Sequence, residues 1–416
     1  MVMLLAGLQT VPIELHEAAE IDGAGTIRRF FSITVPQMSG IIGLVILLEF
    51  IWNFQHFDII YVLTGGGPAG STQTFATAVY ETAFDGFDLG HAGAIGLLWM
   101  ILLMALVVVY VRLEAMTAVL TEETVAAVSA PPAAPRRRRH RADRRASTVS
   151  AWIAVVVFGG FALLPVYWLL ATSLTPRTEV FSYPPKLFPT EITFEAYAAL
   201  ANNPALFGYL RNSIVVSVIT AILSVLVSAY MGYAFSKFRY RGRRSLMYFV
   251  LASQMFPQAL LLITLYAVFS AYGLLNTYTA LVLSFTTFTL PLCVWMLKGF
   301  FDTIPDELIE AARVDGASRL RIIHSIVLPL AAPGLIAAGL FAFVRGWNDF
   351  IFALTLAGPD KQTLPPGLVN TFIGEASTAW PELMAASLVV SLPVAIAFIA
   401  LQRFLVGGLT AGAVKG

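Results

Sequence analysis

The chain has 416 residues, of which 58% are hydrophobic and only 12% are charged. An average soluble domain is about 25% charged, and the mean hydropathy of this chain is +0.77. The composition therefore excludes an ordinary soluble protein and predicts an integral membrane protein. Its one cysteine, Cys293, lies in an apolar segment, so a disulfide within the chain is excluded.

Eight apolar segments are long enough to cross the hydrocarbon core of a bilayer, which takes about 20 residues of helix. They cover approximately residues 39–63, 91–112, 150–172, 211–235, 246–270, 278–301, 326–356 and 384–406. The seventh is overlong, so we expect it to be broken or tilted near Pro333 or Gly346. Residues 1–8 are apolar but too short to span. The expected fold class is an all-α polytopic membrane protein with about eight complete transmembrane helices plus a truncated one.

The positions of the basic residues predict the orientation of these helices. Residues 112–148 and the loop 236–244 are rich in Arg and Lys, which mark the cytoplasmic side of a membrane protein. The loops 64–90 and 173–208 are poor in both residues, so we expect them on the outer side. Alternation along the spans then assigns three further segments to the cytoplasm: residues 9–37, residues 302–325 and the C-terminus.

Residues 114–148 are expected to link two membrane units, 1–113 and 149–416. This segment contains P-P-A-A-P-R-R-R-R, and sequence so rich in Pro, Ala and charge cannot bury enough apolar surface to fold. It is predicted to be a disordered cytoplasmic linker. A basic run attracts phosphate, and beside a membrane this favours anionic membrane lipid over nucleic acid as its partner.

Residues 10–36 and 303–329 form an internal repeat with an offset of 293. The two segments read T-V-P-I-E-L-H-E-A-A-E-I-D-G-A-G-T-I-R-R-F-F-S-I-T-V-P and T-I-P-D-E-L-I-E-A-A-R-V-D-G-A-S-R-L-R-I-I-H-S-I-V-L-P, with 14 of 27 positions identical. Unrelated segments would share only a position or two, so the repeat indicates a duplication. An ordinary interhelical loop would not need these identities twice.

The local chemistry of the repeat predicts two short helices joined by a glycine. In the second copy we expect Thr303 to cap the first helix, with Pro305 in its opening turn. The helix should end at Gly316, where a positive φ is tolerated. Ser318 can then cap the second helix. Each copy should form a compact helical knob on the cytoplasmic side.

These residues resemble the E-A-A loop of binding-protein-dependent ABC importer permeases. The resemblance implies that each first helix docks in a cleft of a cytoplasmic ABC ATPase subunit, where the glutamate meets basic groups and the glycine sets the bend. The implied ATPase-coupling residues are Glu17, Ala18, Ala19, Asp22 and Gly23, and Glu310, Ala311, Ala312, Asp315 and Gly316.

The resemblance extends beyond the loops. Residues 149–416 are similar to a complete six-helix permease of the maltose-transporter inner-subunit type, including W-N-D-F at 347–350 and the ending Q-R-F-L-V-G-G-L-T-A-G-A-V-K-G. Residues 1–113 are similar to the C-terminal part of its partner permease, including V-L-T-G-G-G-P at 62–68. This implies a type I ABC importer permease fold and a gene fusion of two carbohydrate permeases in the bacterial inner membrane. The first permease would lack its N-terminal portion.

Polar groups inside an apolar span are functional candidates because burying them in hydrocarbon is costly. The segment W-N-F-Q-H-F-D at 52–58 interrupts such a span. On one helix Trp52, Asn53 and His56 would share a face that combines aromatic stacking with hydrogen bonds to hydroxyls. The resemblance implies that they bind the sugar. The alternative is hydrogen bonding between helices.

A second polar cluster contains Arg345, Trp347, Asn348 and Asp349. If two residues are allowed as an insertion, Trp347 aligns with Trp52 and Asn348 with Asn53. Arg345 and Asp349 are four residues apart and could pair on one helix face. We expect a gating or packing role here, because the resemblance places the sugar contacts in the other half.

The sequence has no Walker motif, metal-ligand cluster or nucleophile–base pair, so we expect neither an enzyme nor a cofactor bound by this chain. ATP-Mg would bind a separate ATPase subunit dimer, whose interface the C-terminal tail is implied to enter. An extracytoplasmic sugar-binding protein would deliver its cargo to the outer loops 64–90, 173–208 and 357–383. Two alternatives are a secondary transporter or channel and a non-functional fusion remnant. The second applies if Met1 is the true start, because the first unit then has only two complete spans.

Overall fold

The computed structural model describes residues 4, 8, 11–126, 141–184, 186–374 and 378–413. Over these residues the regular structure is helical, apart from one isolated antiparallel bridge between Ile373 and Thr378. The all-α expectation is confirmed. The chain divides into two compact units, one made of Met1–Ser129, Gly242–Val268 and Leu409–Gly416, the other of Ala130–Arg241 and Phe269–Gly408.

The first unit begins with α2 (Ile13–Ile21), α3 (Thr26–Arg29), a π-helical turn (Phe30–Thr34) and α4 (Val35–Gln37). It continues with α5 (Ser39–Phe54), α6 (Asp58–Thr64), α7 (Phe75–Tyr80), a second π-helical turn (Glu81–Asp85), α8 (Leu89–Ala126), α12 (Arg243–Ala252) and most of α13 (Gln258–Ala271). Its aromatic core lies where α5 and α8 meet. The fully buried ring of Trp99 has its centroid 6.5 Å from that of Phe54 and 6.1 Å from that of Phe75.

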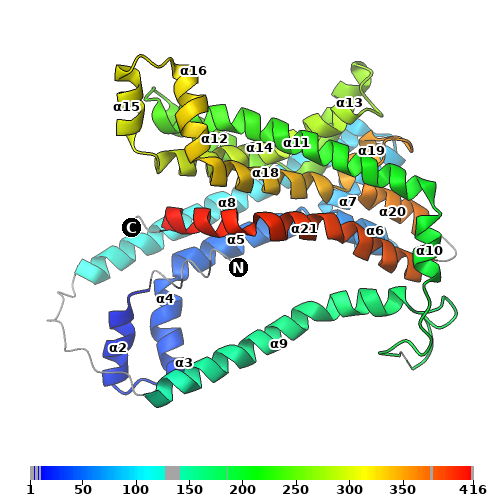
Figure 1. Cartoon of the computed structure of the whole chain (residues 1–416), viewed down its shortest axis with the longest axis horizontal. Coiled ribbons are helices and arrows are strands. Elements are labelled where there is room, and N and C mark those ends of the chain that lie inside the picture. Colours follow the sequence, from blue (N-terminus) through cyan, green and yellow to red (C-terminus); the bar gives the residue numbers. More distant parts are fainter. Residues whose placement is uncertain are drawn as a thin grey trace. The chain divides into compact units, whose positions relative to one another are not determined.

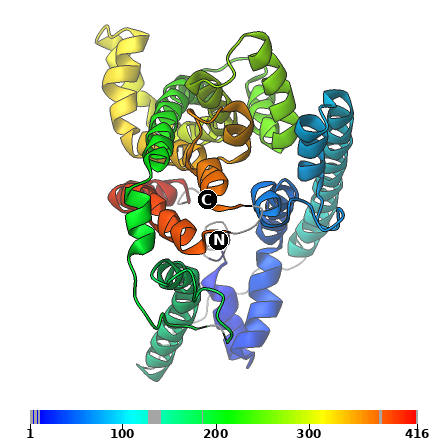
Figure 2. The ribbon, with the colours of Figure 1, turned by 90° about the vertical axis from the view of Figure 1, so that its right-hand side faces the viewer.

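The second unit contains α9 (Arg141–Ser173), α10 (Glu195–Ala201), α11 (Pro204–Lys237), α14 (Tyr278–Asp302), α15 (Asp306–Val314) and α16 (Arg319–Ile322). After a π-helical turn (Ile323–Val327) it continues with α17 (Leu328–Leu330), α18 (Ala332–Trp347), α19 (Ile351–Leu356), α20 (Leu364–Phe372) and α21 (Trp380–Ala413). Figure 1 shows α11, α14 and α18 side by side, with α15 and α16 projecting at one end of the three. Figure 2 shows the same projecting pair after a quarter turn, in yellow.

Small residues allow the three central helices of the second unit to approach closely. Gly232 of α11 lies so near α14 that a Cβ atom there would be 3.1 Å from the backbone nitrogen of Lys298. The hydroxyl groups of Ser224 and Thr289 lie 2.6 Å apart between the same helices. In a membrane, such packing and hydrogen bonding replace the hydrophobic effect as the force that joins helices.

Five helices of the described part of the chain are long and apolar enough to cross a bilayer: Leu89–Tyr110, Ala154–Ser173, Pro204–Lys237, Tyr278–Asp302 and Trp380–Leu401. The number rises to seven if each of two bent pairs is one span. These pairs are Thr26–Gln37 with Ser39–Phe54, bent by 73°, and Arg319–Leu330 with Ala332–Trp347, bent by 78°.

Three of the eight predicted spans are divided. The span 39–63 is interrupted between α5 and α6, and the span 326–356 bends at Ala331 and breaks again after Trp347. The predicted irregularity near Pro333 and Gly346 is therefore confirmed. The span 246–270 is split before Pro257, because a proline drives the preceding residue out of the helical region, and Phe256 has ψ 127°.

The ends of two long helices differ from the predicted disorder of residues 114–148. Helix α8 continues through Ala126 and α9 begins at Arg141, so 114–126 and 141–148 are helical, while the rest of that range lies outside the described residues. Ala, Leu, Glu and Met in 114–126 have high helix propensity, which overrides the low apolar content. Helix α21 likewise continues to Ala413, into the C-terminal tail.

Candidate functional site

The second copy of the repeat folds into the predicted knob. Helix α15 ends at Val314, Gly316 has φ +78°, and the N–H of Ala317 donates to the carbonyl of Ala312 over 2.9 Å. The hydroxyl of Ser318 accepts from the N–H of Arg321, so the predicted second cap is confirmed. The predicted cap by Thr303 is wrong. Because α14 runs to Asp302, Thr303 donates back to the carbonyl of Phe300, and Pro305 occupies the N-cap position of α15.

One face of this knob is buried and the other is exposed. Ile309 and Ala312 join a hydrophobic cluster with Ile322, Val327 and Phe301. The remaining coupling residues are exposed: Glu310, Ala311, Asp315 and Gly316. The knob therefore presents acidic and small side chains outward, while its apolar side chains hold it to the bundle.

Lys237 joins this knob to α11. Its ammonium group donates to the carbonyl of Ile304 over 2.6 Å and to the carboxylate of Asp306 over 2.7 Å, and its side chain is only 8% exposed. The hydrogen bond that Lys237 donates to Asp306, together with its positive charge, lowers the pKa of Asp306. Beside this pair, Asp302 accepts from the hydroxyl of Ser236 over 2.6 Å. The end of α11 is thus bonded to the first turn of the knob.

The first copy of the repeat has the same backbone. Helix α2 starts after Pro12, Gly23 has φ +79°, and the N–H of Ala24 donates to the carbonyl of Ala19 over 2.9 Å. The coupling residues that it exposes are Glu17, Ala18, Asp22 and Gly23, while Ala19 is half-buried.

The side chains that hold the first knob together differ from those of the second. His16 Nε2 lies 3.4 Å from the hydroxyl of Thr34, at the positions that Ile309 and Val327 occupy in the second copy. Arg29 donates to Glu20 over 2.7 Å. The two knobs therefore present similar outer surfaces on differently stabilised interiors.

The duplication extends into the membrane with the offset of 293 unchanged. Helices α5 and α18 end at Phe54 and Trp347, which differ by 293 in number, and both breaks end in a residue of matching conformation. These residues are Phe57 (φ −107°, ψ −51°) and Phe350 (φ −110°, ψ −55°).

This register corrects the alignment of the two polar clusters. Without the two-residue insertion, Trp347 lies opposite Phe54 rather than Trp52, and Asn348 lies opposite Gln55 rather than Asn53. The tryptophans are therefore not equivalent. The W-N pair in each cluster favours an offset of 295, whereas the ends of α5 and α18 give an offset of 293.

The first polar cluster lies at the break between α5 and α6. Helix α5 ends at Phe54, so Trp52, Asn53 and His56 do not share a face of one continuous helix as predicted. Trp52 is 57% exposed, His56 is exposed, and Asn53 donates to the carbonyl of Glu49 over 2.8 Å and to its carboxylate over 3.4 Å. Sequence reasoning missed Glu49, although an acidic residue in an apolar run four residues before Asn53 was the available signal.

The second polar cluster is built around the end of α18. Trp347 is buried, with its ring centroid 5.5 Å from that of Phe343. Asp349 accepts from the N–H groups of Phe352 and Ala353 at 3.2 Å each, capping α19. Helix α18 ends before Asp349, so Arg345 and Asp349 do not lie on one face of a continuous helix as predicted. Arg345 and Asn348 are exposed.

Comparison with known proteins agrees with this architecture. The permease protein YcjP of Escherichia coli (strain K12) is 39% identical over 277 residues, covering 66% of this chain and 98% of that protein. The trehalose permease protein SugB of Mycobacterium tuberculosis is 35% identical over 275 residues, covering 66% and 99%. A bacterial ABC transporter that imports alginate matches with a TM-score of 0.56 at 24% identity, covering 64% and 99%, and so shares the fold.

The family match covers both copies of the repeat. Residues 1–119 and 224–410 match the family described as binding-protein-dependent transport system inner membrane component. Both knobs and both bent helix pairs lie inside these ranges. The chain therefore belongs to this family, whose members are the multi-pass inner-membrane permease components of ABC importers and not enzymes.

Proposed function

We propose that this chain translocates a carbohydrate by alternating access, driven by ATP hydrolysis on partner subunits. The observation that carries the proposal is the pair of knobs, each with an exposed glutamate, an exposed aspartate and a positive-φ glycine. A single chain that presents two such surfaces is suited to a dimeric ATPase. ATP-Mg binds that dimer rather than this chain.

In this proposal the first helix of each knob docks on one ATPase subunit. Glu17 and Glu310 are exposed and can pair with basic groups on that subunit, while Ala18 and Ala311 allow close approach. Asp22, Gly23, Asp315 and Gly316 form the turn that sets the angle of the docked helix. The inward-facing Ala19 and Ala312 link that helix to the rest of its knob.

A carbohydrate is supported by the names of relatives, which include a trehalose permease and a diacetylchitobiose permease. The break after α5 offers an exposed indole at Trp52 and an exposed imidazole at His56. An aromatic face and hydrogen-bonding groups are the combination that sugar rings and hydroxyls require. We assign Trp52, Asn53 and His56 to the sugar site.

The cluster at the end of α18 is assigned to a gate. Trp347 is buried and Asp349 caps α19, so both hold the break together instead of offering free groups to a sugar. The exposed Arg345 and Asn348 complete the gate. Because the break separates two short helices, it can change angle when the knob moves.

The proposed cycle starts with a binding protein that delivers sugar to loops 64–90, 173–208 and 357–383 on the outer side. Closure of the ATPase dimer moves both knobs, which lie with the linker and the C-terminus in the cytoplasm. The bond between Lys237 and Asp306 transmits this motion to α11. The outer ends of the helices then close around the sugar site when the inner ends open, and open when the inner ends close.

The proposal is tested with the chain reconstituted in vesicles with its ATPase subunits and binding protein. Labelled sugar should enter only when ATP, ATPase and binding protein are all present. Uptake by this chain alone, or uptake driven by an ion gradient without ATP, contradicts the proposal and supports a secondary transporter or channel.

A further inference from the structure

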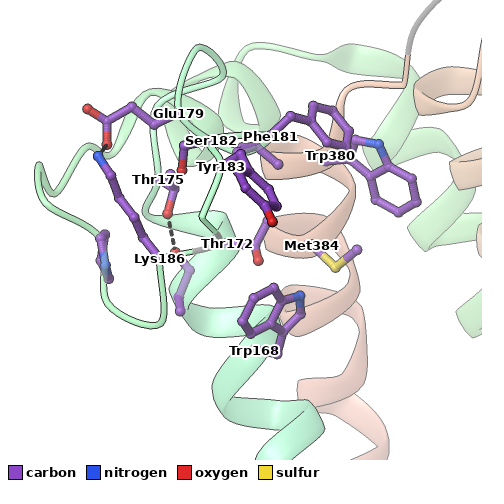
Figure 3. A pocket seen from close by; sticks show the side chains of 13 residues that line it. Trp168, Thr172, Thr175, Glu179, Phe181, Ser182, Tyr183, Lys186, Trp380 and Met384 are labelled. Atoms are coloured by element: carbon purple, nitrogen blue, oxygen red, sulfur yellow. Dashed lines mark hydrogen bonds and ion pairs between the residues drawn. The ribbon is translucent and has the colours of Figure 1, made fainter.

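A pocket of about 480 Å³ opens beside the outer ends of α9 and α21, within the second unit. Figure 3 shows Trp168 and Thr172 on α9, Trp380 and Met384 on α21, and the loop that carries Glu179 and Lys186. The lining includes four aromatic side chains, those of Trp168, Phe181, Tyr183 and Trp380, beside a polar rim. The loop 173–208, which the proposed cycle gives to the binding protein, lines much of this pocket, but that cycle assigns the pocket no ligand.

The polarity of the lining changes along the direction of the spans. Trp168 and Met384 lie inside the spans Ala154–Ser173 and Trp380–Leu401. At 1.5 Å rise per residue they lie roughly 7 and 6 Å from the outer ends of those helices. Glu179 and Lys186 belong to the loop beyond the spans. A ligand that fills the pocket must therefore be apolar at one end and charged at the other.

The rim of the pocket carries Lys186 and Glu179, whose charges are opposite and which can form further hydrogen bonds. The ammonium of Lys186 donates to Glu179 over 3.1 Å and to the hydroxyl of Thr190 over 3.0 Å, and an ammonium has three donors. Both of the hydrogen bonds that Glu179 accepts from these residues end on Oε2. The hydrogen bonds from Thr190 and Lys186 lower the pKa of Glu179, so this carboxylate is ionised at neutral pH.

Hydrogen bonds and an ion pair hold the loop that carries Glu179 and Lys186. Its ends are joined by a hydrogen bond of 2.9 Å from the N–H of Thr193 to the carbonyl of Leu174. Arg177 binds the carboxylate of Glu382 on α21 through two nitrogens, at 2.5 and 2.6 Å, and Glu382 is buried. Residues outside the lining of the pocket therefore hold the loop in shape and join it to α21.

We propose that this pocket binds one phospholipid whose headgroup carries a phosphate and a primary ammonium, as phosphatidylethanolamine does. The phosphate accepts from Lys186, the ammonium donates to Glu179, and the glycerol backbone and upper acyl chain lie against Trp168 and Met384. Adjacent phosphate and ammonium groups match the adjacent Lys186 and Glu179. A soluble sugar fits less well, because the inner end of the pocket offers it apolar walls at the depth of the hydrocarbon.

The test measures lipid retained by the purified full chain in mild detergent, by native mass spectrometry. One phosphatidylethanolamine per chain should be retained in preference to phosphatidylcholine, whose quaternary ammonium donates no N–H, and to phosphatidylglycerol, which has no ammonium. Glu179→Gln and Lys186→Gln should each lower retention about tenfold, the loss expected for one charge-assisted hydrogen bond. Trp152→Phe is the control, an exposed residue on α9 that does not line the pocket.

A second variant separates ligand loss from misfolding. Ala171→Leu adds bulk to the α9 wall of the pocket and leaves Glu179 and Lys186 in place, so it should also lower retention. Equal retention of the three lipids, or retention unchanged by Glu179→Gln and Ala171→Leu, overturns the proposal. Displacement of the lipid by millimolar trehalose overturns it as well and assigns the pocket to a sugar. The measurement involves no transport, so its result does not depend on the proposed importer function.

Discussion

At the residue scale, the side chains of Lys237 and Glu49 make hydrogen bonds near the ends of α11 and α5. In the sequence Lys237 indicates only the orientation of its loop. In the structure it donates hydrogen bonds to the carbonyl of Ile304 and to the carboxylate of Asp306. No spacing rule links residues that are 69 positions apart. Glu49, which accepts from Asn53, had a signal in the sequence because it is an acid in an apolar run.

Substituting Trp52 tests the sugar site. Trp52→Ala should raise the KM for sugar transport about tenfold because it removes one stacking surface, whereas Trp52→Phe should keep most of the affinity. Trp295→Ala is a matched control, since Trp295 is 53% exposed and Trp52 57%. Transport kinetics at varied concentrations of loaded binding protein provide the measurement. An unchanged KM for Trp52→Ala removes this residue from the site.

Substituting Lys237 tests how the knob is attached. Lys237→Met leaves the carbonyl of Ile304 without its donor, at a cost of about 1–3 kcal/mol. The ATPase should still co-purify with the variant, but its stimulation by the binding protein should fall several-fold. Lys298→Met is the control, because it removes only a pair within one helix, worth about 0.5 kcal/mol. Full stimulation in Lys237→Met would falsify the role of this bond.

The same bond predicts a pH dependence. Lys237 lowers the pKa of Asp306 below the ordinary 3.8, so the attachment is fully present above that value and is lost as pH falls through the lowered one. Hydrogen exchange of the amides in α15 should therefore be equally protected at pH 5 and pH 8, after correction for intrinsic rates. Protection that disappears between about pH 5 and pH 6 would point to a different group, because Asp306 titrates below its ordinary value of 3.8.

At the scale of elements, the proposed mechanism depends on the glycine turns and the helix breaks. Gly23 and Gly316 have φ near +80° and no atom within 4 Å of a Cβ position, so the backbone conformation and not space requires glycine. The breaks after α5 and α18 have matching conformations at Phe57 and Phe350. A rigid knob followed by a broken helix can convert motion outside the membrane into a change of angle within it.

Gly316→Ala tests the turn. The substitution should destabilise the knob by about 1 kcal/mol, the cost of a side chain in the left-handed region, and Gly316→Asn should cost less. Gly299→Ala is the control, since Gly299 lies in α14 with no atom within 4 Å of its Cβ position and should be neutral or stabilising. Thermal unfolding of the purified chain measures all three. Equal unfolding temperatures for Gly316→Ala and Gly299→Ala contradict the requirement for positive φ.

At the scale of the whole molecule, two differently stabilised knobs stand on one chain. The second is held by the apolar side chains of Ile309 and Val327, while the first has His16 and Thr34 at those positions. Their exposed surfaces carry the same acidic and small residues. An ATPase dimer that closes symmetrically would need both surfaces.

Charge reversal tests this requirement. Glu17→Lys and Glu310→Lys should each weaken capture of the ATPase, the double variant should abolish capture, and each single variant should abolish transport because closure needs both subunits. Pull-down and vesicle uptake report these outcomes, with the exposed Glu14→Lys in the same helix as control. Transport that survives Glu17→Lys would show that the first knob is dispensable.

The sequence by itself determined the membrane location, the all-α class, the duplication at an offset of 293 and the glycine turns of the knobs. These depend on composition, on identities between two segments and on local backbone conformation, none of which requires knowing which side chains meet. The tertiary structure decided which residues meet: the bond of Lys237 to Asp306, the helix ends that separate Trp52 from His56, and the register that pairs Trp347 with Phe54. Such contacts depend on packing between distant segments, which the apolar pattern of any one segment does not record.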